Sequence, residues 1–240
     1  MKKIFISGSI SIKSLPTKVK ESLLKIINND FKILVGDANG IDMLVQNFCI
    51  NNNFFNLLIY YVDKEPRNIE SGRFSIKKIK VDEEIKKVRE RQTFKDEAMA
   101  KDCDYAFVIW DGKSSGSYNN IKNCLKLNKP LKIYLTEQNN FIKPQANDID
   151  YIFSQNNGYT ASQAVKFINE TKELFKNTRE FNSFLIENKI MIKDGNKYKP
   201  TKNFEALFLE QLYKGQISSY KFTDKAIDEI VKIYNKSSLF

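Results

Sequence analysis

The stretch Tyr105–Ser117, YAFVIWDGKSSGS, decides the fold that is expected of this chain. Its first part is an unbroken apolar run that is too short for an isolated helix, so it predicts a strand buried on both faces, as in a parallel sheet. The glycines, serines and Asp111 that follow predict a turn, and a helical pattern begins at Tyr118. A strand, a loop and a helix in this order place the loop at the carboxyl edge of a parallel sheet, where open α/β sheets bind ligands.

The loop after this strand has the composition of a phosphate-binding loop. Gly112 and Gly116 let backbone N–H groups approach an anion, and Ser114 and Ser117 add hydroxyl donors. The positive end of the following helix dipole adds to the attraction. Neither a Walker loop nor a GxGxxG fingerprint follows a strand here, so this is a phosphate loop of another kind. An ordinary turn rich in small residues is the alternative.

The composition excludes several classes of chemistry. The sequence contains no histidine, which excludes Ser-His-Asp and Cys-His catalysis and His-ligated zinc. Catalysis would therefore use carboxylates, Lys, Tyr, Cys or an oxygen-bound Mg²⁺. The 39 basic and 29 acidic residues give a net charge of +10, which favours anionic partners or reflects a lysine-rich solvated surface.

Length and cysteine usage indicate a cytoplasmic protein. The 240 residues, with 42% hydrophobic side chains, suffice for one large domain with a smaller addition. Cys49, Cys103 and Cys124 lack CxxC spacing and read as reduced core thiols. The apolar segment after Met1 is too short for a signal peptide, and no stretch approaches the roughly 20 apolar residues of a membrane span, so no membrane partner is expected.

Strands and helices alternate over residues 1–140. Helices separate five expected strands: Lys3–Ser7, Phe31–Val35, Leu57–Val62, Tyr105–Trp110 and Leu131–Leu135. This alternation predicts a Rossmann-like, doubly wound, parallel five-stranded sheet, because crossover connections are right-handed and cover both faces. If the first and fourth strands are neighbours, the loops after strands one, two and four meet in one crevice. The long polar segment Asp63–Arg91 is then expected to fold over it, ahead of a short helix at Phe94–Asp102.

Residues 141–240 are expected to form a small helical, winged-helix-like α+β module. Helices are predicted at Ala161–Asn177, Phe181–Asn188, Phe204–Leu212 and Lys225–Asn235, with a hairpin that turns at Asp194-Gly195. The segment Gly195-Asn196-Lys197-Tyr198-Lys199-Pro200-Thr201 resembles a short motif of phage antirepressor C-terminal domains. The module would contact nucleic-acid phosphates through Lys193, Lys197, Lys199 and Lys202, or serve self-association as part of a homo-oligomer.

Several motifs occur in one order along residues 1–140. They are ISGSISIKSLP (6–16), VGDANGIDMLVQ (35–46), PRN (66–68), KDEAMA (95–100) and WDGKSSGSYNNI (110–121). This succession resembles the SLOG superfamily, and most of all its bacterial branch of unknown function, related to DprA-like and lysine-decarboxylase-like Rossmann folds. The resemblance implies binding of a nucleotide or nucleotide sugar, including ligands of the ADP-ribose type. Related LOG enzymes cleave the N-glycosidic bond of nucleoside monophosphates.

Two departures from the family pattern bear on that activity. Where relatives have GSRS, this chain has Gly8-Ser9-Ile10-Ser11, so an arginine that would meet a phosphate is missing. The PGGxGTxxE motif of the LOG enzymes is replaced by Asp111–Ser117, with no glutamate at the matching offset. These departures argue against LOG-type hydrolysis and leave nucleotide binding as the expectation.

The loop chemistry and the resemblance together assign roles to site residues. Phosphate or nucleotide contacts are expected from Gly8, Ser9, Gly36, Gly40, Arg67, Asn68, Lys95, Gly112, Lys113, Ser114, Gly116 and Ser117. The candidate catalytic carboxylates are Asp37, Asp42, Asp96 and Asp111.

Each of these roles has a plainer alternative. The glycines and serines are also ordinary turn residues, and Asp42 would either accept from ribose hydroxyls or cap its helix. Asp37 and Asp111 would act on a bond, hold Mg²⁺ or merely form turns. Lys95 and Asp96 would orient a ligand or pair with each other at the surface.

Three functions follow from these observations. The first is a protein that binds an ADP-ribose-like or NAD-like nucleotide derivative, as a sensor or a sequestering protein. The second is an N-glycoside hydrolase or transferase that acts on nucleotides through aspartates. The third is a phage-type DNA-binding regulator that works through the C-terminal module and the positive charge.

Overall fold

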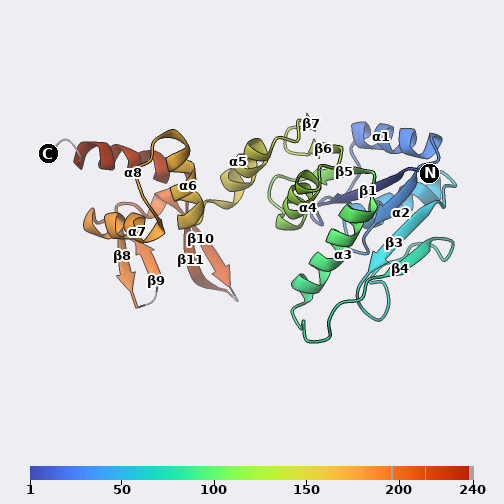
Figure 1. The fold of residues 1–240 in the computed structure, drawn as a ribbon, viewed down its shortest axis with the longest axis horizontal. Coiled ribbons are helices and arrows are strands. Elements are labelled where there is room, and N and C mark those ends of the chain that lie inside the picture. Colours follow the sequence, from blue (N-terminus) through green and yellow to red (C-terminus); the bar gives the residue numbers. More distant parts are fainter. Residues whose placement is uncertain (196, 214, 238–240) are drawn as a thin grey trace. The chain divides into compact units, whose positions relative to one another are not determined.

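The structure is a computed structural model that describes residues 1–195, 197–213 and 215–237 (Figure 1). The chain divides into two compact units, Met1–Ile149 and Asp150–Phe240. No helix within the described ranges is both long and apolar enough to span a bilayer.

The first unit is built on a seven-stranded sheet. Its strands are β1 (Lys3–Gly8), β2 (Lys32–Val35), β3 (Leu57–Tyr61), β4 (Ser75–Lys78), β5 (Tyr105–Trp110), β6 (Leu131–Leu135) and β7 (Asn140–Ile142). Their order is β4-β3-β2-β1-β5-β6-β7, and all neighbours run parallel except β6 and β7. The predicted Rossmann-like parallel sheet is confirmed for strands β1 to β6, and the added edge strand β7 is antiparallel.

The predicted number of five strands is wrong, because an edge strand adds to each side. β4 has the sequence SIKK, and all its residues are exposed, so it lacks the apolar signal of a buried strand. β7 is only three residues long. Strands this short and polar hold their place through backbone pairing with a neighbour, which a single sequence does not reveal.

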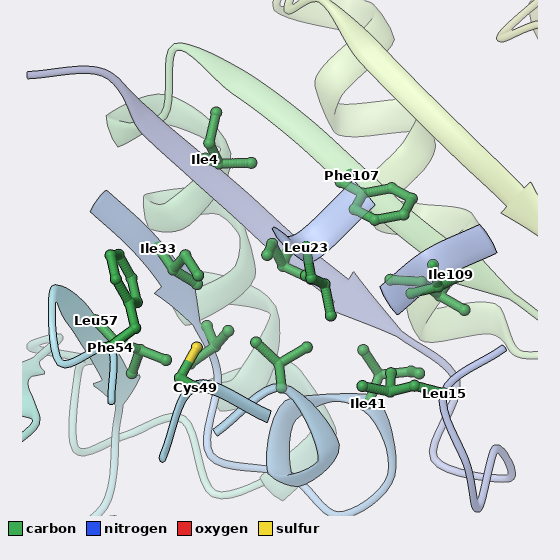
Figure 2. Packing of buried hydrophobic residues seen from close by; sticks show 14 of the residues in the cluster. Ile4, Leu15, Leu23, Ile33, Ile41, Cys49, Phe54, Leu57, Phe107 and Ile109 are labelled. Atoms are coloured by element: carbon green, nitrogen blue, oxygen red, sulfur yellow. The ribbon is translucent and has the colours of Figure 1, made fainter. Parts of the chain in front are cut away.

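Helices cover both faces of this sheet. α1 (Thr17–Asn28) and α2 (Ile41–Asn51) pack on one face, and α3 (Val88–Asp102) and α4 (Ser115–Lys126) pack on the other. Along β1, Ile4 and Ile6 belong to the core under α1 and α2, whereas Phe5 belongs to the core under α3 and α4. Figure 2 shows Ile4 in the first of these cores. This alternation is the doubly wound arrangement that the apolar runs predict.

The three cysteines lie in these two cores. Cys49, on α2, belongs to the core between the sheet and the helices α1 and α2. Cys103, just after α3, and Cys124, on α4, belong to the core on the other face of the sheet. All three are buried, and none forms a disulfide with another cysteine of the described chain. Their burial agrees with the prediction of core thiols.

The first and fourth predicted strands, β1 and β5, are neighbours. Their register pairs Gly8 with Ile109, and the Ser9 N–H donates to the Ile109 carbonyl at 3.1 Å just beyond the strand. The chain therefore runs outward from β1 through β2, β3 and β4 and then returns to β5 beside β1. Such a reversal of strand order opens a crevice at the carboxyl edge, which is where the loops after β1, β2 and β5 lie.

Helix α3 is longer than predicted. It begins at Val88 rather than Phe94, so the polar segment at residues 63–91 contains β4 and the first turn of a helix. The early part of α3 shows no apolar face because several of its side chains, including Arg89 and Gln92, line a cavity and do not pack on the sheet. Helix α4 likewise begins at Ser115, three residues before the predicted start.

The second unit combines helices with two hairpins. Its helices are α5 (Ala146–Asn157), which starts in the first unit, α6 (Ala161–Thr171), α7 (Thr178–Glu187) and α8 (Asp224–Ser237). The hairpins pair β8 (Met191–Asp194) with β9 (Lys197–Pro200) and β10 (Phe208–Tyr213) with β11 (Gln216–Phe222). The α+β character is confirmed, and the hairpin at Asp194-Gly195 is present, although Asn196 lies outside the described residues.

The predicted helix at Phe204–Leu212 is wrong. Only a 3₁₀ turn, η1 (Glu205–Leu207), precedes strand β10. Phe208 pairs with Phe222 across the hairpin, both rings are buried, and their centroids lie 5.0 Å apart. Burial of this cross-strand pair outweighs the helix propensity of the segment. Helices α5, α6 and α7 thus precede the two hairpins, and α8 follows them. Four lysines are exposed on or beside the first hairpin: Lys193, Lys197, Lys199 and Lys202.

Leu23→Ala is expected to lower the free energy of unfolding by about 2–5 kcal/mol, because Leu23 is a fully buried residue of α1 and its truncation leaves a cavity in the core. Leu24→Ala, at the next position but 39% exposed, is the matched control and should change stability far less. Urea unfolding of both variants checks this expectation. Equal losses would contradict the assignment of Leu23 to the core.

Candidate functional site

A cavity of about 600 Å³ opens at the carboxyl edge of the sheet, in the first unit. Residues from the loops after β1, β2 and β5, from α3 and from α4 surround it. Of the residues expected at the site, the cavity is lined by Gly8, Ser9, Asp42, Arg67, Lys95, Asp96, Asp111, Ser114, Gly116 and Ser117. The remaining ones, which lie behind the lining or beside it, are Gly36, Asp37, Gly40, Asn68, Gly112 and Lys113.

Asp37 is fully buried and holds the wall of the cavity together. Its Oδ1 accepts from Lys95 Nζ and from Arg67 Nη2, each at 2.7 Å, and its Oδ2 accepts from the Arg67 backbone N–H at 3.0 Å. Asn68 Nδ2 donates to the Asp37 carbonyl at 2.8 Å. Burial alone would raise the pKa of Asp37, but the hydrogen bond and charge of Arg67 and Lys95 outweigh it and lower the pKa to about 2.

The predicted alternative of a surface ion pair between Lys95 and Asp96 is wrong. Lys95 is only 2% exposed, and it pairs with Asp37 from a distant part of the chain, not with Asp96 at the surface. A buried ammonium requires a paired carboxylate, so this cation is part of the frame of the site. Arg67 and Asn68 come from the segment after β3 and contact Asp37.

Gly36 leaves room for this network. A β-carbon at residue 36 would lie 2.5 Å from Asp42 Oδ2 and 3.0 Å from Lys95 Nζ, closer than atoms approach without displacement. The Asp42 carboxylate occupies that space and accepts from the Ala38 N–H at 3.1 Å. Gly36 therefore shapes the wall through its missing side chain and does not line the cavity.

Two carboxyl groups in the lining have raised pKa values. Burial raises the pKa of Asp42 to about 6 in spite of the nearby Lys95 charge. Burial likewise raises the pKa of Asp96 to about 7. No described side chain or backbone N–H donates a hydrogen bond to Asp96, which leaves its carboxyl for the cavity. The histidine-free site thus contains a group that exchanges a proton near neutral pH.

A cluster of three hydroxyls connects the loops after β1 and β5. The Ser9 hydroxyl lies 2.6 Å from that of Ser114 and 3.3 Å from that of Ser117, and Ser114 donates to Ser117 at 2.9 Å. Ser9 Oγ also accepts from the Asp111 N–H at 3.1 Å. The hydroxyls expected in the phosphate cradle are therefore in mutual contact.

Asp111 holds the loop after β5 in shape. Its Oδ1 accepts from the N–H groups of Lys113 and Ser114 at 2.9 and 2.7 Å, and its Oδ2 accepts from the Ser11 hydroxyl at 2.6 Å. Burial would raise the pKa of Asp111, but these hydrogen bonds lower it overall. Both oxygens are engaged, so Asp111 acts here as a turn residue. Trp110 is fully buried and donates from Nε1 to the Ser114 carbonyl at 3.2 Å, so it belongs to the core.

The amino end of α4 opens on the cavity. Ser115, Gly116 and Ser117 form its first turn and line the cavity, and the first backbone hydrogen bond runs from the Tyr118 N–H to the Ser114 carbonyl. Ser114 places no side-chain acceptor on the N–H groups of this turn. The backbone N–H groups of this first turn can therefore donate to a ligand, and the helix dipole favours an anionic one at this position.

Other lining residues were not expected from the sequence. Arg89 on α3 donates to the Ser115 hydroxyl across the cavity mouth. Ser7 Oγ and Asn120 Oδ1 lack a hydrogen-bond partner among the described residues, although both residues line the cavity and are buried. The sequence does contain a pattern that could have identified the lining residues of α3 and α4, because they recur at every third or fourth position. They are Arg89, Gln92, Asp96 and Met99 on α3, and Gly116, Asn120 and Asn123 on α4. Such spacing places side chains on one face of a helix.

The carboxylates are not arranged to hold Mg²⁺. Asp37 is engaged by two cationic groups, and Asp111 is engaged by donors of its own loop. Within the described residues, no three metal-ligating side chains come together. The cations beside Asp37 would repel a divalent ion, so this donor set does not fit the ion.

The comparisons with known proteins identify no family. No family model matches the chain, and no curated protein matches it. One solved structure with a similar fold is that of DNA processing protein A from Helicobacter pylori, described for its single-stranded DNA binding mode. The identity is 16%, the TM-score is 0.41, and the match covers 55% of this chain and 64% of that one. This chain thus spans less than two thirds of that protein, and we draw nothing on function from the likeness.

Asp96→Asn is expected to change how stability depends on pH. Ionising Asp96, whose pKa rises from 3.8 to about 7, costs more in the folded chain than in the unfolded chain. The free energy of unfolding of the unsubstituted chain should therefore fall, relative to that of Asp96→Asn, as the pH rises from about 4 to about 8. Urea unfolding at a series of pH values measures this difference. Parallel curves for the two proteins would contradict the raised pKa.

Proposed function

We propose that the first unit binds an anionic nucleotide derivative of the ADP-ribose or NAD type, as a sensor or sequestering protein, with a phosphate at the amino end of α4. The observation that carries the proposal is the first turn of α4, whose N–H groups open on a cavity of about 600 Å³. That volume lies within the range of small-molecule sites. Membership of the SLOG superfamily is part of the same proposal.

Three features support a phosphate at this position. Arg89 brings a guanidinium to the mouth of the cavity beside Ser115. The hydroxyls of Ser9, Ser114 and Ser117 form a cluster that can donate to an anion next to the helix. Gly116 leaves the approach open, since a β-carbon there would meet no heavy atom within 4 Å.

Gly116→Asp is expected to weaken nucleotide binding by about 10- to 100-fold, because a carboxylate would stand where the phosphate binds. The fold should tolerate the change, as an acidic residue in the first turn of a helix interacts favourably with its dipole. Gly116→Asn, which has the same shape without the charge, is the matched control and should retain most of the affinity. Calorimetric titration with ADP-ribose, NAD and AMP gives the affinities.

The proposal fails if none of these ligands raises the melting temperature of the unsubstituted protein. It also fails if a ligand binds and Gly116→Asp leaves its affinity equal to that of Gly116→Asn. A ligand that binds in that way would occupy another part of the surface.

A second function, cleavage of an N-glycosidic bond, is favoured by one observation. Asp96 lines the cavity, accepts no hydrogen bond from the described residues and has a pKa of about 7. A carboxyl group of that kind is partly protonated at neutral pH and can deliver its proton to the leaving base of a nucleotide. As the C–N bond breaks, water would add to the same sugar carbon and give up a proton to the Asp96 carboxylate, so that a nucleoside monophosphate yields the free base and the sugar phosphate.

Incubation of the protein with AMP should, under this second function, release adenine at a rate that falls as the pH rises above about 7, because the acid form of Asp96 is then lost. Asp96→Asn should abolish the release while preserving nucleotide binding. Chromatography of the reaction mixture measures the base. Intact nucleotide after prolonged incubation, with binding demonstrated, would leave only the binding function.

A further inference from the structure

The wall of the cavity contains two buried polar atoms, on Ser7 and Asn120, that nothing in the described chain satisfies, and this part of the wall is called the floor below. Ser7 lies on β1 and is 5% exposed, and Asn120 lies on α4 and is 6% exposed. Both line the cavity, and neither Ser7 Oγ nor Asn120 Oδ1 has a hydrogen-bond partner. Buried polar atoms are nearly always paired, so two such atoms in the wall of one cavity point to a ligand that completes them.

The charges around these atoms restrict the ligand group that fits. The carboxyl groups of Asp42 and Asp96 line the same cavity, and the two cations beside them, Arg67 and Lys95, are already paired with Asp37. The exposed Arg89 and the amino end of α4 lie at the mouth of the cavity. A phosphate is therefore favoured at the mouth and disfavoured at the floor, where it would face the carboxyl groups. The floor suits an uncharged group.

The apolar and aromatic side chains of the lining also restrict where a planar base can bind. None of the described residues that line the cavity is aromatic, so the floor offers no ring on which a base would stack. The exposed apolar side chains in the lining, Ile10 and Val88, are 55% and 66% exposed and belong to the mouth. A planar base is thus better placed near the mouth than at the floor.

A ligand hydroxyl group can form hydrogen bonds with the unpaired atoms of the floor, Ser7 Oγ and Asn120 Oδ1. Asn120 Oδ1 accepts only, and Ser7 Oγ both donates and accepts. An alcohol can donate to the first and either accept from or donate to the second. Two adjacent hydroxyls can serve both atoms, and the Asp96 carboxyl offers a further acceptor beside them.

We propose that the floor formed by Ser7 and Asn120 binds the vicinal hydroxyls of a ribose, so that the site selects ribonucleotides over deoxyribonucleotides. This inference rests on the proposed nucleotide-binding function and adds the sugar specificity. A ligand without the 2′-hydroxyl would leave one buried polar atom unpaired after water has been displaced. Sites built to pair with a ligand hydroxyl reject analogues that lack it.

The test compares AMP with 2′-deoxy-AMP in calorimetric titrations of the full chain. AMP is expected to bind at least about tenfold more tightly. Asn120→Leu, which replaces the amide with an apolar group of similar size, should reduce that ratio toward one, and Ser7→Ala should reduce it as well. Ser7→Ala removes a single oxygen, so it keeps the test decisive if Asn120→Leu does not fold.

Each outcome distinguishes this inference from the function on which it rests. If both ligands bind equally to the unsubstituted chain and Gly116→Asp weakens both, the phosphate site stands and the ribose floor is overturned. If neither ligand binds, both are overturned. A preference for AMP that persists unchanged in folded Asn120→Leu and Ser7→Ala would also overturn the assignment to these two residues.

Discussion

The buried carboxylate of Asp37 is the interaction on which the site depends. It joins three segments that are distant in the sequence: its own loop after β2, Arg67 from the connection after β3, and Lys95 from the middle of α3. Removing one partner from a buried ion pair leaves an uncompensated charge, which is far more costly than the loss of a surface pair. The position of α3, and with it Arg89 and Asp96, is therefore tied to the end of β2.

The reversal of strand order between β1 and β5 supplies the other constraint. Because these two strands are neighbours, Ser9 after β1 reaches Ser114 and Ser117 after β5, more than 100 residues later in the chain. Gly8 permits this approach, since a β-carbon there would lie 2.4 Å from the Ile109 carbonyl oxygen and 2.5 Å from the Ile41 side chain. The two constraints position residues that line one cavity, because Arg67 and Lys95 contact Asp37 and Ser9 contacts Ser114 and Ser117.

The outline of the fold was predictable because the buried strands of a parallel sheet are continuous apolar segments in the sequence. Five of the seven strands were predicted from such segments. The convergence of their loops was expected on the condition that the first and fourth strands are neighbours, which β1 and β5 are. Lys95 was misjudged because a buried lysine is exceptional and its partner Asp37 lies 58 residues away. Asn120 and Arg89 were not predicted as site residues because they lie on the helices α4 and α3. The predicted site rested mainly on glycine and serine residues, which mark loops. Phe204–Leu212 was misread as a helix because its pairing with β11 is a tertiary contact that local propensity does not contain.

The outer strand β4 has a consequence for how copies of the protein meet one another. It carries one of the two backbone edges of the sheet, the other being that of β7, and an open edge is a template onto which a strand of another molecule can add. Two of its residues, Lys77 and Lys78, are lysines, and Lys77 is held in place by Asp102 and lies over the ring of Tyr60. Positive charge fixed along this short strand opposes sheet extension between like molecules. The sheet thereby carries its own protection against edge-to-edge aggregation.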